Sequence, residues 1–265
     1  MNCKICGKAN DFFYEGIILN KYKIKYFKCP NCLFVQTEEP YWIKEAYSEV
    51  INNSDVGYVD RNIVLSKVTS KIINRFFKKS EKFLDYGSGY GLFVRLMRDL
   101  GYDFYWQDAY CEDIFAKGFE IEDVVSKKFE LITAFELFEH FVEPISEIEK
   151  ILNFSKNIFV STFLFPSSNP KPDEWWYYGL EHGQHISLYS YETMKFIAEK
   201  YNLNFYSNKK NLHLFTDRKI NRVIFKYINL WNIYYSLKPF SFNKSLMEKD
   251  YQSIVTKLTK EAKTD

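Results

Sequence analysis

Residues 82–101 read KFLDYGSGYGLFVRLMRDLG. A short apolar strand is expected to end at Asp85, and a loop with three glycines in five residues follows it. Apolar residues then recur at helical spacing from Leu92 to Leu100, and Gly101 ends the helix. The glycines allow backbone to approach a ligand without Cβ atoms in the way. The stretch therefore predicts a strand, a ligand-binding turn and a helix.

Two classes of cofactor-binding turn connect a strand to a helix in this way. Dinucleotide enzymes use G-x-G-x-x-G, in which the third glycine allows close packing of the helix. Here Leu92 stands three positions after Gly89, so that fingerprint is absent. The loop reads Asp-x-Gly-x-Gly-x-Gly instead, and it resembles motif I of the class I S-adenosylmethionine-dependent methyltransferases. The resemblance implies that the loop lies beneath the amino-acid part of S-adenosylmethionine (SAM).

Two further segments extend this resemblance. Asp108 ends the next predicted strand, 21 residues after Gly87, and a carboxylate there suits hydrogen bonds from two ribose hydroxyls. Residues 129–141, FELITAFELFEHF, resemble the fourth strand of the family and its F-E-x-x-E-H segment, with Glu130 in place of the more usual aspartate. The resemblance implies a cofactor site made of Asp85, Tyr86, Gly87, Ser88, Gly89, Gly91, Asp108, Phe135 and Glu136.

The alternation of strands and helices defines the expected fold. Residues 142–153 read as a helix and residues 157–165 as a buried strand, while 205–209 and 211–218 suit an antiparallel hairpin at the end of the sheet. Such alternation is typical of parallel sheets with helices on both faces. We therefore expect an α/β fold: a doubly wound, Rossmann-like, seven-stranded methyltransferase sheet with a small N-terminal zinc ribbon.

Four of the five cysteines form two C-x-x-C pairs: Cys3 with Cys6, and Cys29 with Cys32. Two such pairs supply the four thiolates of a closed, tetrahedral zinc site. Since no ligand position is left for water, this zinc is expected to be structural and to fold a segment too small to fold alone. A redox role for either pair is the alternative, although neither opens a helix in a thioredoxin-like context.

A histidine-rich loop follows the predicted strand at 157–165 and precedes a helix from Tyr191 to Tyr201 that Ser190 caps. Loops beyond the carboxyl ends of the strands bind ligands in open α/β sheets. Methyl transfer to a hydroxyl, or to a carbon beside a ketone, releases a proton that a neutral histidine can accept. The candidate bases are, in order, His185, His182 and His140, with Glu181 and Glu139 as possible orienting carboxylates.

Two alternatives for these histidines stay open. They can simply cap or bridge backbone groups, which is common for histidines in loops. His182-x-x-His185 can also bind zinc, although no third ligand of suitable spacing is evident from the sequence.

The same loop carries the clearest indication of the methyl acceptor. Four consecutive aromatic residues, 175–178, could stack on a sugar or shield the methyl group from water. Together with residues 183–190, GQHISLYS, they resemble a subgroup of methyltransferases with zinc-binding N-terminal segments. This resemblance implies a small carbohydrate-based acceptor, such as a sugar, a nucleotide sugar or a glycan precursor, or a natural-product intermediate.

Charge and hydropathy limit the partners. The net charge of +2 is too small to indicate a nucleic-acid partner by itself. Residues 206–244 carry eight Lys or Arg and one acidic residue, with aromatic residues between them. This segment could contact a membrane surface or an anionic substrate. Alternatively, it forms a packed pair of helices with solvated lysines. The N-terminus lacks the apolar region of a signal peptide, and no apolar run is long enough to span a membrane. A cytosolic location is expected; oligomeric state is not indicated.

These patterns predict three parts: a zinc-ribbon module at 1–45, a SAM-dependent methyltransferase domain at 46–218 and a helical C-terminal extension at 219–265. The predicted function is methyl transfer from SAM to a small acceptor. The alternatives are a zinc-dependent binding protein with a methyltransferase-like scaffold domain and a nucleotide-sugar oxidoreductase. Asp85, Asp108 and the complete glycine set oppose the first, and Leu92 opposes the second.

Overall fold

The computed structural model describes residues 1–47, 57–228 and Lys249. The chain divides into two compact units, one of Met1–Asp55 with Thr133–Lys226 and the other of Val56–Ile132 with Tyr227–Asp265. Of the predicted helical extension at 219–265, helix α6 (Arg222–Tyr227) is described. Nearly all of the residues after it, including 229–244 of the basic aromatic segment, lie outside the described residues. No described helix is both long and apolar enough to cross a membrane.

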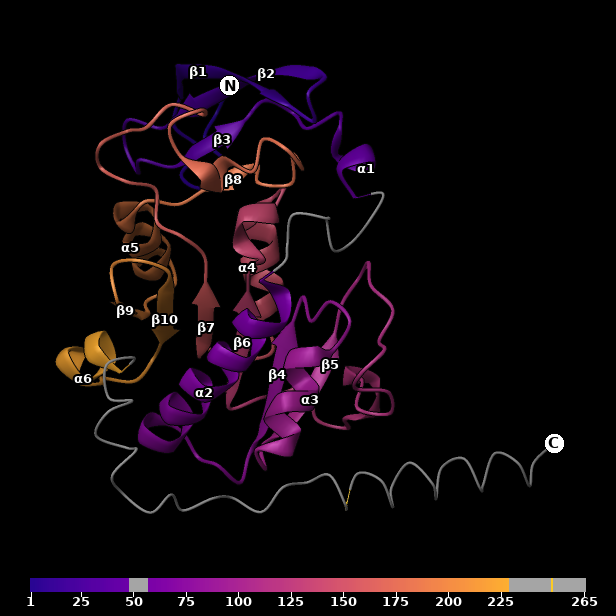
Figure 1. Cartoon of the computed structure of the whole chain (residues 1–265). Coiled ribbons are helices and arrows are strands. Elements are labelled where there is room, and N and C mark those ends of the chain that lie inside the picture. Colours follow the sequence, from indigo (N-terminus) through magenta and orange to yellow (C-terminus); the bar gives the residue numbers. More distant parts are fainter. Residues whose placement is uncertain (48–56, 229–248, 250–265) are drawn as a thin grey trace. The chain divides into compact units, whose positions relative to one another are not determined.

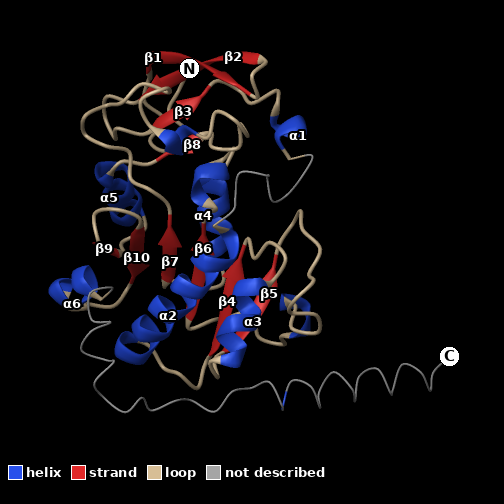
Figure 2. Cartoon of the chain, viewed as in Figure 1, coloured by secondary structure: helices blue, strands red, loops and turns tan. Residues whose placement is uncertain are grey.

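Six strands form one sheet in the order β5-β4-β6-β7-β10-β9 (Figures 1 and 2). Parallel pairing dominates, and β10 runs antiparallel to both of its neighbours. This confirms the expected Rossmann-like methyltransferase fold and its terminal hairpin. The strands are β4 (Lys82–Tyr86), β5 (Asp103–Gln107), β6 (Leu131–Phe135), β7 (Ile158–Ser161), β9 (Asn204–Ser207) and β10 (Leu212–Thr216).

The sheet has six strands among the described residues, where seven were expected. Next to β5, the chain makes one parallel bridge, between Trp106 and Glu120, and then turns into the short helix η1 (Ile121–Asp123). A single bridged residue does not count as a strand, so the edge position is taken by an irregular segment.

The unit that contains Val56–Ile132 is built around β4 and β5. Helices α2 (Tyr58–Phe76) and α3 (Leu92–Asp99) belong to it, and both bury one apolar face. The rings of Phe83 and Phe104 stack across the two strands with their centroids 5.1 Å apart. This core fixes the end of β4, from which the glycine-rich loop begins.

The other unit contains a second, four-stranded sheet in the order β1-β2-β3-β8. Its first three strands come from the N-terminal segment, whereas β8 comes from the loop that carries the histidines. The strands are β1 (Asp11–Ile18), β2 (Tyr22–Lys28), β3 (Val35–Thr37) and β8 (Ser187–Leu188). Tyr26, Trp42 and Tyr178 belong to its buried core.

This unit also contains helices α1 (Ile43–Ala46), α4 (Pro144–Leu152) and α5 (Tyr191–Lys200) and the short helices η2 (Phe138–His140) and η3 (Trp176–Tyr178). Ser190 caps α5 as predicted, because its hydroxyl accepts the Thr193 N–H in a capping box. Thr193 in turn donates to the Cys32 carbonyl at 2.8 Å. The start of α5 is therefore tied to the second cysteine pair.

His213, on β10, should make the free energy of unfolding depend on pH. The ring is fully buried; Nε2 lies 3.0 Å from the Thr162 carbonyl and Nδ1 lies 2.9 Å from the Ser207 hydroxyl. Burial lowers the pKa of this histidine to about 4 from 6.5. At a pH between these two values the unfolded chain binds more protons than the folded protein does. The free energy of unfolding therefore falls as the pH decreases from 6.5, and the total loss is about 3 kcal/mol once the pH is below 4.

Urea denaturation of the wild type and of His213→Gln at pH 7.5 and pH 4.5 measures this effect. Glutamine can make both hydrogen bonds but has no ionisable group, so the variant should lose less stability on acidification. Other titrating groups act equally in both proteins. An identical loss in the two proteins would show that His213 is not the cause.

Candidate active site

The glycine-rich loop connects β4 to α3 in left-handed backbone conformations. The φ angles of Gly87, Gly89 and Gly91 are 76°, 53° and 85°, a region that favours glycine. A Cβ at Gly91 would lie 2.6 Å from the Asp113 carboxylate and 3.2 Å from the backbone nitrogen of Ala116. A Cβ at Gly89 would meet only the Tyr58 hydroxyl, at 3.6 Å. Gly91 is therefore required by packing, while Gly89 leaves open space beside the loop.

Asp108 and the loop are joined by hydrogen bonds. The Gly89 N–H donates to the Asp108 carboxylate at 2.9 Å, and the N–H groups of Tyr110 and Cys111 donate to its other oxygen at 2.8 and 2.9 Å. The structure thus brings together the two parts of the predicted cofactor site that lie in this unit.

Asp85 and Ser88 have structural partners in the same loop. Asp85 is buried, and its carbonyl accepts the Ser88 hydroxyl at 2.6 Å. The Ser88 hydroxyl oxygen also accepts the Gln107 N–H at 3.1 Å, while the N–H groups of Gly87 and Ser88 donate to the Gln107 carbonyl. Tyr86 is half-buried at the end of β4. These contacts hold the turn against the end of β5.

Phe135 and Glu136, at the end of β6, belong to the other unit. Glu136 has a φ of 48°, which is unusual for a residue with a side chain and costs about 1–2 kcal/mol. Its N–H donates to the Ser161 carbonyl at 3.0 Å, and the Ser161 hydroxyl donates to its carboxylate at 2.6 Å. Ser161 therefore holds a strained acidic residue in place at the carboxyl end of the strand.

The four paired cysteines form one cluster. Their sulfur atoms all lie within 4.8 Å of one another; Cys3 and Cys32 are 3.5 Å apart, and Cys6 and Cys29 are 3.4 Å apart. A disulfide needs about 2.05 Å, so these cysteines are not bridged. Four sulfurs at about 2.3 Å from a central zinc in a tetrahedron would be about 3.8 Å apart. The cluster therefore fits a four-thiolate zinc site, and Cys111 lies outside it.

The cysteine cluster is connected to the histidine loop through the second sheet. Strand β3, which follows the second cysteine pair, pairs with β8, two residues after His185. The Thr37 N–H donates to the Ile186 carbonyl at 3.1 Å, and the Ile186 N–H donates to the Glu139 carbonyl at 2.9 Å. One hydrogen-bonded path thus runs from the N-terminal strands to the loop that carries the histidines.

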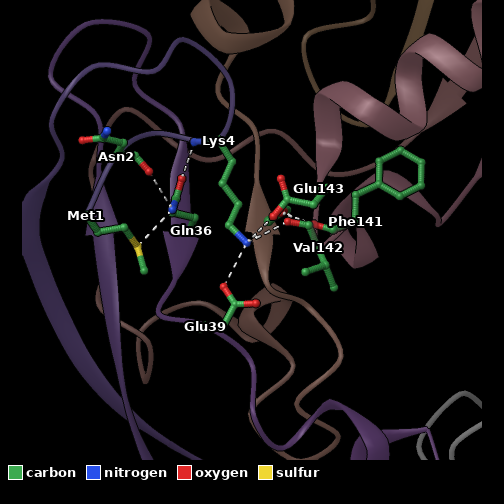
Figure 3. A network of polar contacts seen from close by, with 9 residues as sticks. Met1, Asn2, Lys4, Gln36, Glu39, Phe141, Val142 and Glu143 are labelled. Carbon is green, nitrogen blue, oxygen red and sulfur yellow. Dashed lines mark hydrogen bonds and ion pairs between the residues drawn. The ribbon is translucent and has the colours of Figure 1, made fainter.

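A polar network at Lys4, inside the first cysteine pair, adds a second connection (Figure 3). Its ammonium donates to the Val142 carbonyl at 2.9 Å and lies 3.1 Å from Glu143 and 3.4 Å from Glu39. Its backbone N–H donates to the Gln36 side chain at 2.9 Å. The network joins the four-cysteine segment to the chain just after His140.

The structure brings the three predicted bases together in this unit. The ring centroids of His140 and His185 are 5.1 Å apart, and those of His182 and His185 are 4.7 Å apart. His185 Nδ1 lies 2.6 Å from the Tyr177 carbonyl, so it carries the proton and Nε2 keeps a lone pair. His182 Nδ1 accepts the Gln184 N–H at 3.1 Å, so its Nε2 carries the proton in the neutral ring. Of these two, His185 has the better arrangement for a base.

The two candidate orienting carboxylates lie in different surroundings. Glu181 is exposed, whereas Glu139 is fully buried. One Glu139 oxygen accepts the Tyr177 hydroxyl, and the other has no hydrogen-bond partner. Burial, together with the charge of Glu136, raises the pKa of Glu139 to about 8. We define Glu139, His140, Tyr177, His182 and His185 as the histidine cluster.

Two tyrosines at this site, Tyr177 and Tyr47, make polar contacts that the sequence did not predict. The sequence predicts that Tyr177 stacks on a sugar or shields the methyl group, but its hydroxyl also donates to Glu139 and lies 3.2 Å from the Thr162 hydroxyl. Its carbonyl contacts His185. The Tyr47 hydroxyl lies 2.7 Å from His140 Nδ1. Because these residues come from four separate parts of the chain, no spacing in the sequence indicates that they meet.

The chain matches the sequence profile of a family described as a methyltransferase domain, over residues 62–208. This match covers more than half of the 265 residues. The chain belongs to this methyltransferase family. Together with the fold and the complete glycine-rich loop, membership makes it a methyltransferase that uses SAM. No protein of curated function has a sequence that matches the chain.

A search of solved structures found methyltransferases that are similar to this chain at low sequence identity. The plantazolicin methyltransferase BpumL, in complex with a monoazolic desmethylPZN analogue and S-adenosylhomocysteine (SAH), is 15% identical, with 68% of this chain and 94% of that chain aligned and a TM-score of 0.41. Human N-acetylserotonin methyltransferase in complex with SAM is 12% identical, with 67% and 66% aligned and a TM-score of 0.39. At these values the likeness carries no argument about the substrate of this methyltransferase.

Proposed function

We propose that this methyltransferase transfers the methyl group of SAM to an oxygen or carbon atom of a small, carbohydrate-based acceptor, and that the histidine cluster activates the acceptor. The single observation that supports this most strongly is the arrangement of His185. Its Nδ1 is held by the Tyr177 carbonyl while Nε2 keeps its lone pair, within a group of buried and half-buried polar side chains. Such a nitrogen can accept the proton that the acceptor loses.

The proposed cofactor site comprises the glycine-rich loop and Asp108, with Phe135 and Glu136 as predicted from the family resemblance. SAM supplies a methyl group on a positively charged sulfur, so the protein has mainly to bind and align the two reactants. The open space beside Gly89 and the hydrogen bond that joins its N–H to Asp108 support this assignment. Calorimetric titration should show binding of SAM and SAH and no binding of NAD, whereas tight NAD binding would contradict the assignment.

The aromatic residues of the loop support a carbohydrate-based acceptor. Trp176 is 69% exposed, and its ring lies 5.2 Å from that of Phe163. An exposed indole beside a second ring offers an apolar face on which a sugar can stack. Trp175, Tyr177 and Tyr178 are mostly enclosed and pack against one another. A screen of sugars and nucleotide sugars with methyl-labelled SAM tests the acceptor class directly.

The four-cysteine cluster is proposed to hold a structural zinc ion, and the cytosolic location predicted from the sequence is retained as part of this proposal. All four ligand positions are thiolates, so no position is left for a reacting group. Zinc would therefore stabilise the N-terminal strands and take no part in methyl transfer. The contact of the strands with the histidine loop supports an indirect effect on the active site.

Replacing His185 with alanine should lower the rate of methyl transfer about 10²- to 10⁴-fold, as is usual for loss of an acid or base group. The affinity for SAM should change less than about threefold, because His185 and the glycine-rich loop belong to different units. Labelled-methyl turnover and calorimetry measure the two quantities. Turnover equal to that of the wild type would remove His185 from the proposed role.

A further inference from the structure

Three side chains of the histidine cluster could bind one metal ion. Glu139, His140 and His185 each offer a ligand atom, and these atoms all lie within 4.8 Å of one another. Glu139 and His140 belong to η2, and His185 lies just before β8. The hydrogen bond from the Ile186 N–H to the Glu139 carbonyl, 2.9 Å long, holds the two segments together. The grouping is separate from the four cysteines.

Each of the three side chains also makes a hydrogen bond to a neighbouring tyrosine. His185 Nδ1 donates to the Tyr177 carbonyl at 2.6 Å, and His140 Nδ1 lies 2.7 Å from the Tyr47 hydroxyl. Glu139 accepts the hydroxyl of Tyr177. Metal-binding histidines in proteins almost always use their second nitrogen in this way, because the bond fixes the ring and its tautomer. The cluster has the supporting contacts that a metal site needs.

The surroundings of Glu139 independently indicate a missing positive partner. Its side chain is fully buried, and one carboxylate oxygen has no hydrogen-bond partner. A buried polar atom without a hydrogen-bond partner destabilises the folded state, and more strongly if it is charged. The negative charge of Glu136 acts on Glu139 in addition. A cation would both bind the unpartnered oxygen and offset this charge.

We propose that Glu139, His140 and His185 bind a divalent cation. Two imidazoles and one carboxylate favour a first-row transition ion over Mg²⁺ or Ca²⁺, which prefer oxygen ligands only. Three protein ligands leave coordination positions for other oxygen atoms, as in catalytic metal sites. The site thus differs in kind from the closed cysteine site.

The role of the cation rests on the proposed function. An acceptor hydroxyl that binds a cation becomes more acidic, as metal-bound water does. Its proton would pass to solvent, a bond would form between its oxygen and the methyl carbon, and the bond from that carbon to the sulfur of SAM would break to give SAH. His185 then acts as a ligand, and the cation takes over the activation of the acceptor.

Titration of the zinc-loaded, full-length protein with Mn²⁺ tests the site, with calorimetry and electron paramagnetic resonance as readouts. The wild type should bind about one equivalent of Mn²⁺. His185→Ala and Glu139→Gln should weaken this binding at least about 10-fold, since even supporting residues of metal sites change affinity 10- to 100-fold. His182→Ala is the matched control, because this imidazole lies outside the ligand group, and it should bind Mn²⁺ as the wild type does.

Glu139 is fully buried, so its variant could fail to fold; His185 is half-buried, and its variant, checked by circular dichroism, decides the test. Absence of Mn²⁺ binding by the wild type, or equal binding by folded His185→Ala, would overturn the proposal. Both measurements are made without SAM or acceptor. Binding of Mn²⁺ without binding of SAM would contradict the proposed function alone, and binding of SAM without binding of Mn²⁺ would contradict the cation site alone.

Discussion

Gly89→Ala is expected to fold normally and to bind SAM at least about 10-fold more weakly than the wild type. The new Cβ would contact only the Tyr58 hydroxyl, at 3.6 Å, so the protein itself has room for it. The φ of 53° adds a cost of about 1–2 kcal/mol for a residue with a side chain. The methyl group would occupy open space that the proposal assigns to the cofactor.

Gly91→Ala is the matched comparison, because its Cβ would collide with protein. That atom would lie 2.6 Å from the Asp113 carboxylate and 3.2 Å from the Ala116 backbone. We therefore expect this variant to lose more stability in urea denaturation than Gly89→Ala does. SAM affinity equal to that of the wild type in folded Gly89→Ala would show that the cofactor does not approach the loop at this glycine.

Cys29→Ser is expected to release the zinc ion and to lower methyl transfer by about 10²-fold or more, an effect as large as loss of an acid or base group. Structural zinc contributes its binding free energy to folding, so the N-terminal strands should unfold without it. Strand β3 would then no longer pair with β8, and the loop that carries His182 and His185 would lose its support. SAM affinity should be retained, since the glycine-rich loop and Asp108, which form most of the proposed cofactor site, lie in the other unit.

Metal analysis, near-ultraviolet circular dichroism, calorimetry with SAM and labelled-methyl turnover measure these effects. Cys111→Ser is the control, because this cysteine lies outside the cluster and in the other unit. It should keep its zinc. Full activity in a zinc-free Cys29→Ser protein would contradict a structural role for the metal.

The sequence alone was sufficient for the features that depend on neighbouring residues. The glycine set predicted a strand, a turn with left-handed residues and a helix, because only local backbone geometry is needed for each. Each C-x-x-C pair predicted its own tight turn for a similar reason, and the need of structural zinc for four thiolates predicted that the two turns meet. Ser190 at the start of α5 was likewise predictable from local hydrogen bonding.

The tertiary structure decided the features that depend on distant residues. Sequence spacing suggested no third ligand near His182 and His185, yet folding places Glu139 and His140 beside His185 and leaves His182 outside the ligand group. It also puts β8 next to β3, so that the cysteine segment supports the histidine loop. These contacts arise when separate strands pair and bury a shared core, and such long-range pairing has no signature in local sequence.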